Sequence, residues 1–171
     1  MTKGMIHLYT GNGKGKTTAA IGAAIRARGA GKQVFFTQFV KGMHYSELSI
    51  LQSISGITVR QYGRECFIVH TPSRDDIEKA REGLAEVATV LKEGSYDMVI
   101  LDEACIALYY KLFSLEEMIT AINARRPHIE IIVTGRYAPQ ELIDYADLVT
   151  EMREIKHYYT KGVTARDGIE K

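Results

Sequence analysis

A run of glycines, lysines and threonines near the start of the chain has the composition of a phosphate-binding loop. The run reads Gly11-Asn12-Gly13-Lys14-Gly15-Lys16-Thr17-Thr18. Glycines let backbone N–H groups approach a phosphate closely, and the first turn of a following helix adds its positive end. In such a loop Lys16 supplies a charge for the phosphates and the Thr17 hydroxyl a ligand for Mg²⁺. The run is therefore predicted to bind a nucleoside triphosphate.

One position of the loop departs from the strict pattern G-x-x-x-x-G-K-[ST]. The pattern places its first glycine where this chain has Thr10, and the first glycine, Gly11, comes one residue later. We expect a loop that is shorter or differently shaped, with phosphates seated differently from those of a GTPase. A glycine-rich turn without a ligand is the alternative, and the neighbouring lysines and threonines argue against it.

A pair of acidic residues, Asp102-Glu103, directly follows the apolar run at 97–101. In P-loop folds this position delivers a carboxylate to Mg²⁺, either directly or through water. An acidic pair at a strand end is by itself often only a solvated loop. Together with the phosphate loop it predicts a metal site, with either carboxylate as the ligand.

Short apolar runs alternate with longer helical stretches around these motifs. Strands are expected at 5–9, 33–39, 57–62, 97–101, 129–134 and 148–152. Helices are expected at 17–28 and 46–54, behind the capping boxes Ser73/Asp76 and Ser114/Glu117, and from Pro139 as a first helical residue. This alternation predicts an α/β, three-layer P-loop NTPase (RecA-like) fold with a mostly parallel central sheet, formed by residues 1–171 as a single domain.

Composition excludes several classes of function. The 171 residues carry a formal net charge of +1, which argues against nucleic acid or an anionic membrane as a partner. No apolar run approaches the roughly 20 residues of a membrane-spanning helix, and no signal peptide is recognisable, so a cytoplasmic location is expected. The two cysteines, Cys66 and Cys105, lie outside any Cys-x-x-Cys pattern and are interpreted as reduced thiols.

Ordered blocks along nearly the whole chain resemble the P-loop ATP:corrinoid adenosyltransferases. Besides the phosphate loop, the blocks are Gln38-Phe39-Val40-Lys41-Gly42, Leu101-Asp102-Glu103, Thr134-Gly135-Arg136-Tyr137-Ala138-Pro139, Ala146-Asp147-Leu148-Val149-Thr150-Glu151-Met152, Lys156-His157 and Gly168-Ile169-Glu170. The resemblance implies ATP and a corrinoid as substrates, with Mg²⁺ or Mn²⁺. It also suggests a homodimer and a separate flavoprotein reductant.

The resemblance implies a reaction that needs no general base. Co(I) of the corrinoid attacks the 5′ carbon of the ATP ribose, and the whole triphosphate leaves. The protein then has to hold the triphosphate and neutralise the charge that develops on it. By resemblance, Gly11 through Thr18 bind ATP, Lys16, Thr17 and Glu103 are catalytic, and Thr17 and Glu103 bind the metal, with Asp102 as a further candidate.

A further set of residues consists of candidate contacts to the corrinoid or the nucleotide. They are Gln38, Lys41, Phe67, Arg136 and His157. Each also has a simpler interpretation, as a strand end, a solvated charge, a core ring or a surface side chain.

Two departures from the family pattern affect the expected site. Family members from enteric bacteria carry an N-terminal extension that covers the active site, whereas this sequence begins almost at the first expected strand. We therefore expect that cover to be absent or supplied differently. Those members also place a Phe and a Trp beside the corrinoid, but this sequence contains no Trp. The corresponding region is 62–68, where Phe67 is a candidate substitute.

Other functions remain open at this stage. A P-loop nucleotide kinase or ATPase would cleave at the γ-phosphate and would need a base or a positioned acceptor. A non-catalytic ATP- and corrinoid-binding module would bind both ligands without turnover. A RecA-like DNA ATPase is disfavoured by the near-neutral charge.

Overall fold

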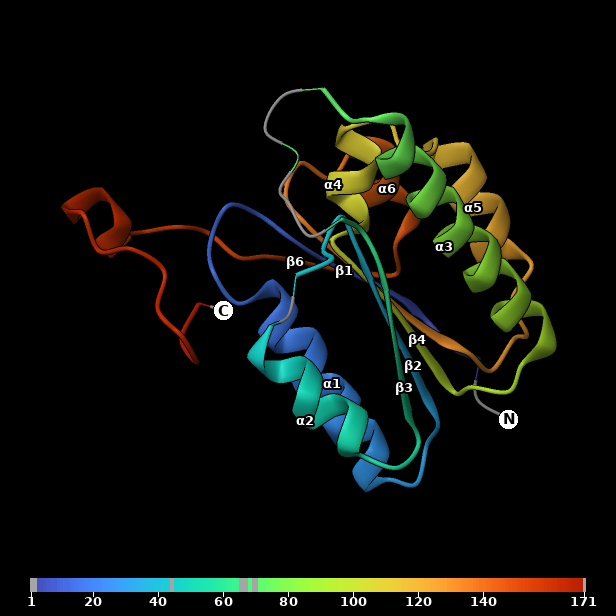
Figure 1. The fold of residues 1–171 in the computed structure, drawn as a ribbon. Coiled ribbons are helices and arrows are strands. Elements are labelled where there is room, and N and C mark those ends of the chain that lie inside the picture. The colour runs from blue at the N-terminus through green and yellow to red at the C-terminus, as the bar shows by residue number, and fades with distance from the viewer. Residues whose placement is uncertain (1–2, 44, 65–67, 69–70, 171) are drawn as a thin grey trace.

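The computed structural model describes residues 3–43, 45–64, 68 and 71–170, and shows a parallel sheet between two layers of helices (Figure 1). The strands are β1 (Ile6–Thr10), β2 (Val34–Phe39), β3 (Ile57–Tyr62), β4 (Met98–Asp102), β5 (Glu130–Thr134) and β6 (Leu148–Glu151). Their order is β3-β2-β4-β5-β1-β6, and every adjacent pair is parallel. The predicted α/β class and the parallel sheet are confirmed.

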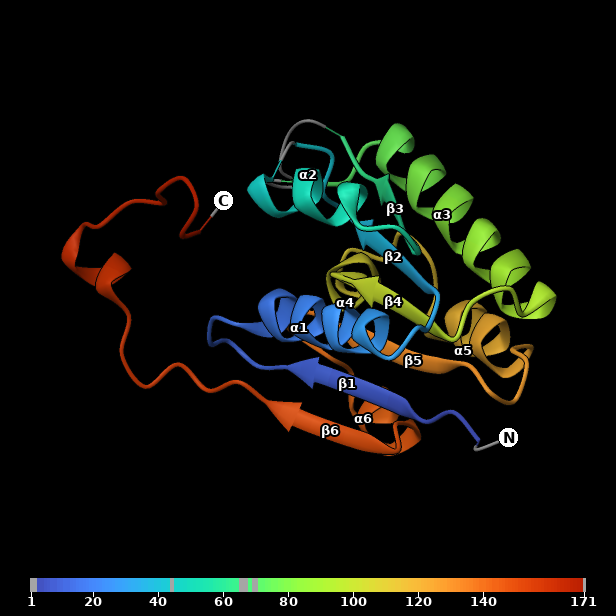
Figure 2. The same ribbon diagram turned by 90° about the horizontal axis from the view of Figure 1, so that it is seen from below.

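The helices cover both faces of this sheet (Figures 1 and 2). One face carries α1 (Lys16–Gly29) and α2 (Ser46–Ser53), and the other carries α3 (Arg74–Glu93), α4 (Ala104–Tyr109), α5 (Leu115–Asn123) and α6 (Gln140–Tyr145). Because side chains of a strand alternate between faces, β2 contributes Phe36 to the core beneath α1 and α2, and Phe35 and Phe39 to the core beneath the other helices. The two separate cores account for the three layers.

Local signals in the sequence located most helix boundaries. Both predicted capping boxes are present, at Ser73/Asp76 and Ser114/Glu117. Pro139, predicted as the first residue of a helix, is instead the extended residue that precedes α6, with ψ near 151°. The short helix α4 was not predicted, because its six residues give little periodicity.

Sheet pairing extends two strands by one residue at their carboxyl ends. Thr10 belongs to β1 because it pairs with Glu151, and Asp102 belongs to β4 because it pairs with Gln38. The predicted strands ended one residue earlier at both places. Asp102 is consequently part of the sheet, whereas Glu103 is the first residue beyond it.

The C-terminal segment leaves β6, extends away from the sheet and contains the 3₁₀ helix η1 (Tyr158–Lys161) (Figure 2). Its last residues turn back toward the phosphate loop, where Lys14 contacts Ile169 and Glu170. Within the described part of the chain, no helix is both long and apolar enough to cross a membrane.

Candidate functional site

The phosphate loop lies between β1 and α1, and its glycines are required by close packing against the end of β6. The Gly13 N–H donates to the Met152 carbonyl oxygen at 2.6 Å. A Cβ at Gly13 would also lie 2.6 Å from that oxygen, and one at Gly11 would collide with it as well. Gly15 adopts a φ of 116°, which side-chain-bearing residues rarely reach, and precedes the first turn of α1. The loop therefore owes its shape to a contact that is distant in sequence.

Thr10, which replaces the expected first glycine of the motif, has a structural task of its own. Its side chain is buried, and its hydroxyl donates to the Gly135 carbonyl oxygen at 2.9 Å. This bond ties β1 to the end of β5. A glycine at this position would lack the hydroxyl, so the departure from the strict pattern is explained by a link between two neighbouring strands.

Lys16 closes the loop on itself. Its ammonium donates to the carbonyl oxygens of Gly11 at 2.8 Å and Gly13 at 2.6 Å. Burial of the ammonium, together with the nearby charge of Arg136, lowers the pKa of Lys16. The lysine is thus held at the loop by weak neutral acceptors, which a phosphate oxygen can replace with a charge-assisted bond.

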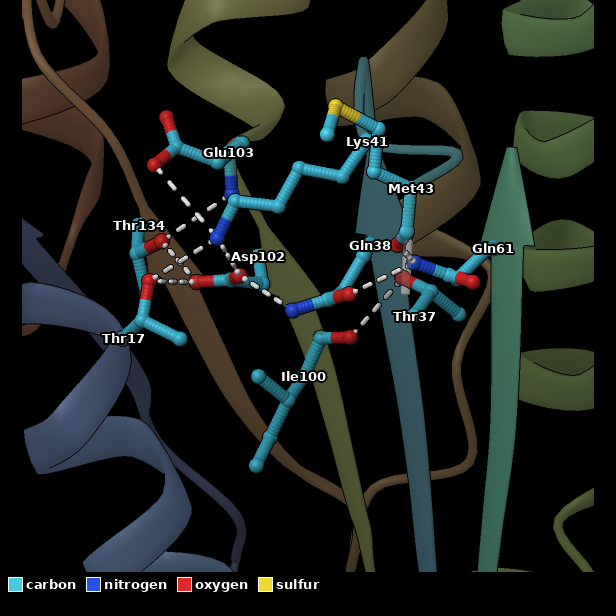
Figure 3. Close-up of polar contacts among 10 residues, drawn as sticks. All are labelled: Thr17, Thr37, Gln38, Lys41, Met43, Gln61, Ile100, Asp102, Glu103 and Thr134. Carbon is cyan, nitrogen blue, oxygen red and sulfur yellow. Dashed lines mark hydrogen bonds and ion pairs between the residues drawn. The ribbon is translucent and has the colours of Figure 1, made fainter. Parts of the chain in front are cut away.

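Asp102 is buried, and each of its carboxylate oxygens already accepts two hydrogen bonds (Figure 3). Oδ1 accepts from the hydroxyls of Thr17 at 2.9 Å and Thr134 at 2.7 Å. Oδ2 accepts from the Lys41 ammonium at 3.1 Å and the Gln38 amide at 3.2 Å. With its acceptor positions taken by protein donors, Asp102 is suited to orient the side chains around it.

The Gln38 amide is itself held in one orientation. The Gln61 side-chain amide on β3 donates to Gln38 Oε1 at 3.1 Å and to the Met43 carbonyl oxygen at 3.1 Å. Gln38 therefore has its amide nitrogen left to face Asp102 (Figure 3). A chain of hydrogen bonds runs across β3, β2 and β4 to the acidic pair.

Glu103 differs sharply from its neighbour. Its backbone is left-handed, with φ 59°, so the chain turns immediately after β4, and its N–H donates to the Thr134 hydroxyl at 3.0 Å. Its carboxylate has a single recorded partner among the described residues, the Lys41 ammonium at 3.8 Å. Burial, followed by the negative charge of Asp102, raises the pKa of Glu103 against the opposing charges of Lys41, Lys16 and Arg136. This carboxylate has oxygen atoms to offer a ligand.

Lys41 projects from the end of β2 into the acidic pair. Its ammonium lies 3.1 Å from Asp102 Oδ2, 3.4 Å from Thr17 Oγ1 and 3.8 Å from Glu103 Oε1 (Figure 3). Burial alone would lower the pKa of Lys41, but the carboxylates of Asp102 and Glu103 outweigh it and raise the pKa. A positive charge thus occupies the place where three potential metal ligands converge.

The remaining loop residues point elsewhere. Asn12 and Thr18 are exposed. The Lys14 ammonium donates to the Ile169 carbonyl oxygen and to Glu170 Oε1, each at 2.8 Å, and so joins the loop to the C-terminal segment. The predicted run is therefore brought together as a loop, but its two lysines face different surroundings.

The other candidate contacts are only partly brought to this group. Arg136 is exposed directly after β5, and its charge is close enough to lower the pKa values of Lys16 and Glu103. His157 directly precedes η1, and its Nδ1 accepts from the Tyr159 N–H at 3.0 Å. Within the described part of the chain, His157 makes no contact with the acidic pair. Phe67 lies outside the described residues.

Two residues of the group, Thr134 and Gln61, were not predicted as site residues. Thr134 lies at the carboxyl end of β5, beside β4, and contacts both acidic residues. Its signals in the sequence were its place at the end of an apolar run and at the start of the block Thr134–Pro139, neither of which singles out its side chain. Gln61 gave no signal, because its role depends on β3 pairing with β2.

Comparisons with known proteins agree with this arrangement. Residues 2–170 match the family model described as ATP:corrinoid adenosyltransferase BtuR/CobO/CobP. The chain is 38% identical to the corrinoid adenosyltransferase of Escherichia coli K12, with 98% of this chain and 86% of the relative covered. The Salmonella typhimurium corrinoid adenosyltransferase CobA is also 38% identical, with the same coverage. The corrinoid adenosyltransferase of a Sinorhizobium species is 35% identical, over 98% of this chain and 80% of the relative.

The family match spans both the phosphate loop and the acidic pair, and it continues into the C-terminal segment that contacts Lys14. The resemblance inferred from the motifs is thereby confirmed. The chain belongs to the ATP:corrinoid adenosyltransferase family.

Proposed function

We propose that this protein transfers the 5′-deoxyadenosyl group of ATP to the Co(I) centre of a reduced corrinoid and releases triphosphate, in adenosylcobalamin biosynthesis or salvage. The observation that carries the proposal is a phosphate loop closed by Lys16 beside an acidic pair held by Thr17, Lys41 and Gln38, in a chain that matches the family over residues 2–170.

In the proposed reaction the electron pair of Co(I) forms the cobalt–carbon bond, and the bond between C5′ and the triphosphate oxygen breaks. The leaving triphosphate takes the electrons of that bond, so negative charge develops at the loop. Donors aimed at such a position lower the barrier because they need no rearrangement during the reaction. Lys16 and the unpaired N–H groups of the first turn of α1 supply these donors.

The oxygen ligands around Lys41 fit a divalent cation. Hydroxyl and carboxylate oxygens are the ligands that Mg²⁺ prefers, and Mg²⁺ is commonly held by one or two carboxylates together with substrate phosphates. We assign direct binding to the Thr17 hydroxyl and the Glu103 carboxylate, because both oxygens of Asp102 are already used by protein donors. Bound there, Mg²⁺ or Mn²⁺ would neutralise charge on the triphosphate.

Asp102 is then a positioning residue. It accepts from the Thr17 hydroxyl, which leaves an oxygen lone pair of Thr17 directed away from Asp102. Gln38 holds the other oxygen of Asp102, and Arg136 lies at the exposed side of the group. We propose contact with the nucleotide or the corrinoid for Arg136 and His157, and contact with the corrinoid for Phe67.

Further parts of the proposal concern the assembly. We propose that residues 1–171 act as one domain within a cytoplasmic homodimer, supplied with Co(I) corrinoid by a flavoprotein. Support for the dimer comes from β6, an edge strand whose four residues are all exposed, with Leu148 43% and Val149 40% accessible. Light scattering at several protein concentrations tests it.

Phosphorus NMR tests the reaction directly. Anaerobic incubation with ATP, Mg²⁺ and chemically reduced corrinoid is expected to yield inorganic triphosphate in step with a light-sensitive adenosylated corrinoid. ADP would place cleavage at the γ-phosphate and favour a kinase or ATPase. ATP binding without any turnover, once Co(I) has been verified spectroscopically, would favour a binding module.

A further inference from the structure

The Lys41 ammonium occupies the position that the proposed function gives to a divalent cation. It lies within 4 Å of one oxygen atom each of Thr17, Asp102 and Glu103, at 3.4, 3.1 and 3.8 Å. The side chain of Lys41 is 16% exposed and that of Asp102 is fully buried. The buried Asp102 carboxylate needs a compensating positive charge, and Lys41 supplies it in this arrangement.

A divalent cation bound by the Thr17 hydroxyl and the Glu103 carboxylate would lie next to the ammonium. Like charges at this separation repel, and a partly dehydrated site screens them less than bulk water does. Both cations would also contact the Thr17 hydroxyl and the Glu103 carboxylate. Lys41 and the metal are therefore alternatives for these ligands.

The backbone around Lys41 is held in place, so replacement of the ammonium by a metal requires movement of the Lys41 side chain only. Val40 has a φ of 65°, which is unusual for a β-branched residue, and its N–H donates to the Tyr62 carbonyl oxygen at 3.1 Å. Gly63 packs so closely on this segment that a Cβ there would lie 2.6 Å from the Lys41 backbone. The long side chain of Lys41 retains its rotatable bonds and carries the ammonium over the Tyr45 ring, 5.1 Å from its centroid.

We propose that Lys41 is a built-in counter-cation that stabilises the acidic pair before metal and ATP bind. Its ammonium turns away from Asp102 and Glu103 when a divalent cation binds to Thr17 and Glu103. The inference rests on the metal site of the proposed function and is independent of its corrinoid chemistry. It makes Lys41 a positioning residue that lowers the metal affinity of the nucleotide-free protein. Metal binding is thereby directed toward the complex with ATP, whose phosphates offer the ammonium new partners.

Mn²⁺ titration of the nucleotide-free protein tests this competition, with free Mn²⁺ measured by electron paramagnetic resonance. Lys41→Met keeps an unbranched side chain that is one heavy atom shorter and removes the charge. The variant is expected to bind Mn²⁺ about 5- to 150-fold more tightly than the unmodified protein, the usual range for coupling between two sites. Lys32→Met, an exposed lysine after α1, is the matched control and is expected to leave the affinity unchanged. Adding Glu103→Gln to Lys41→Met is expected to remove the gain.

A second measurement needs no charge-removing variant. In the protein labelled with ¹³C at lysine Cε, the Lys41 resonance, assigned by its loss in Lys41→Arg, is expected to shift on addition of Mg²⁺ while that of Lys32 stays in place. Equal or weaker Mn²⁺ binding by Lys41→Met overturns the inference. If that variant does not fold, an unshifted Lys41 resonance at saturating Mg²⁺ does so instead. Neither titration contains a corrinoid, so both test the competition between Lys41 and the metal separately from the proposed reaction. If the competition is observed but the protein produces no triphosphate, the inference stands and the proposed reaction is wrong.

Discussion

Two groups of charged residues adjoin the phosphate loop, and they differ in burial. The inner group is Lys41 with Asp102 and Glu103, where the Asp102 side chain has no exposed surface. The outer group is Lys14 with Glu170, where the lysine side chain is 44% exposed, joined by Arg166 and Tyr158. Both groups join distant parts of the chain, yet only the inner one has little water with which to replace a lost partner. Similar contact distances in the two groups therefore correspond to different energies and different tasks.

The largest expected effect is on the inner group. Asp102→Asn removes the negative charge that compensates Lys41, and the new side chain has nearly the same shape as that of Asp102. Removing one member of a buried ion pair typically costs about 3–5 kcal/mol. We expect a loss of this size in the free energy of unfolding, measured by urea denaturation. The double variant Asp102→Asn with Lys41→Met should recover part of it. A decrease in the free energy of unfolding below about 1 kcal/mol would show that the inner group contributes no more than a surface ion pair.

The two lysines of the loop are expected to differ in their effect on activity. Lys16→Ala removes the ammonium that the loop carbonyls hold and is expected to lower kcat by about 10²–10³-fold, as loss of a donor to developing charge does. Lys14→Ala should cost less, because its ammonium is directed at Glu170. Triphosphate release is the assay, and an unchanged urea midpoint for Lys16→Ala is the control. Full turnover by Lys16→Ala would contradict the proposed role of Lys16 as a donor to the leaving triphosphate.

A smaller effect with a distinct pH dependence is expected at Glu103. Burial and Asp102 raise the pKa of Glu103, so the native state of the metal-free protein binds a proton more readily than the unfolded chain. This preference for the protonated form stabilises the native state fully below the usual glutamate pKa of 4.5. The stabilisation is lost as the pH rises through the folded-state pKa of Glu103. Glu103→Gln should therefore stabilise the metal-free protein at neutral pH and give no gain below about pH 4.5. Thermal unfolding across this range provides the measurement, and a gain independent of pH would contradict it.

The smallest effect is expected in the outer group. Glu170 accepts from Arg166 and Lys14, and these bonds hold the pKa of its carboxyl far below the usual range, but the side chains of Arg166 and Lys14 are 52% and 44% exposed. Exposed ion pairs contribute little and are screened by salt. Glu170→Gln is expected to leave the melting temperature unchanged at about 0.15 M salt, near physiological ionic strength. A clear drop that persists in high salt would show that the C-terminal segment stabilises the loop.

The sequence by itself determined the features that depend on local chemistry. The loop from Gly11 to Thr18, the acidic pair after an apolar strand and the two capping boxes all follow from residue types at short spacing. The alternation of strands and helices likewise predicted a parallel sheet, because parallel strands need crossover connections. The predictions for Phe67 and His157 as contacts stay predictions.

The difference between the two carboxylates depends on the tertiary structure. Asp102 is surrounded by donors from β2, β5 and α1, whereas Glu103 turns out of the sheet. Strand order places Gln38 and Thr134 on either side of β4, although they lie far apart in sequence. It also brings Lys41 onto the oxygens expected for a metal. No local pattern contains this information, because hydrogen bonds between neighbouring strands are set by the pairing of the sheet and not by the spacing of residues along the chain.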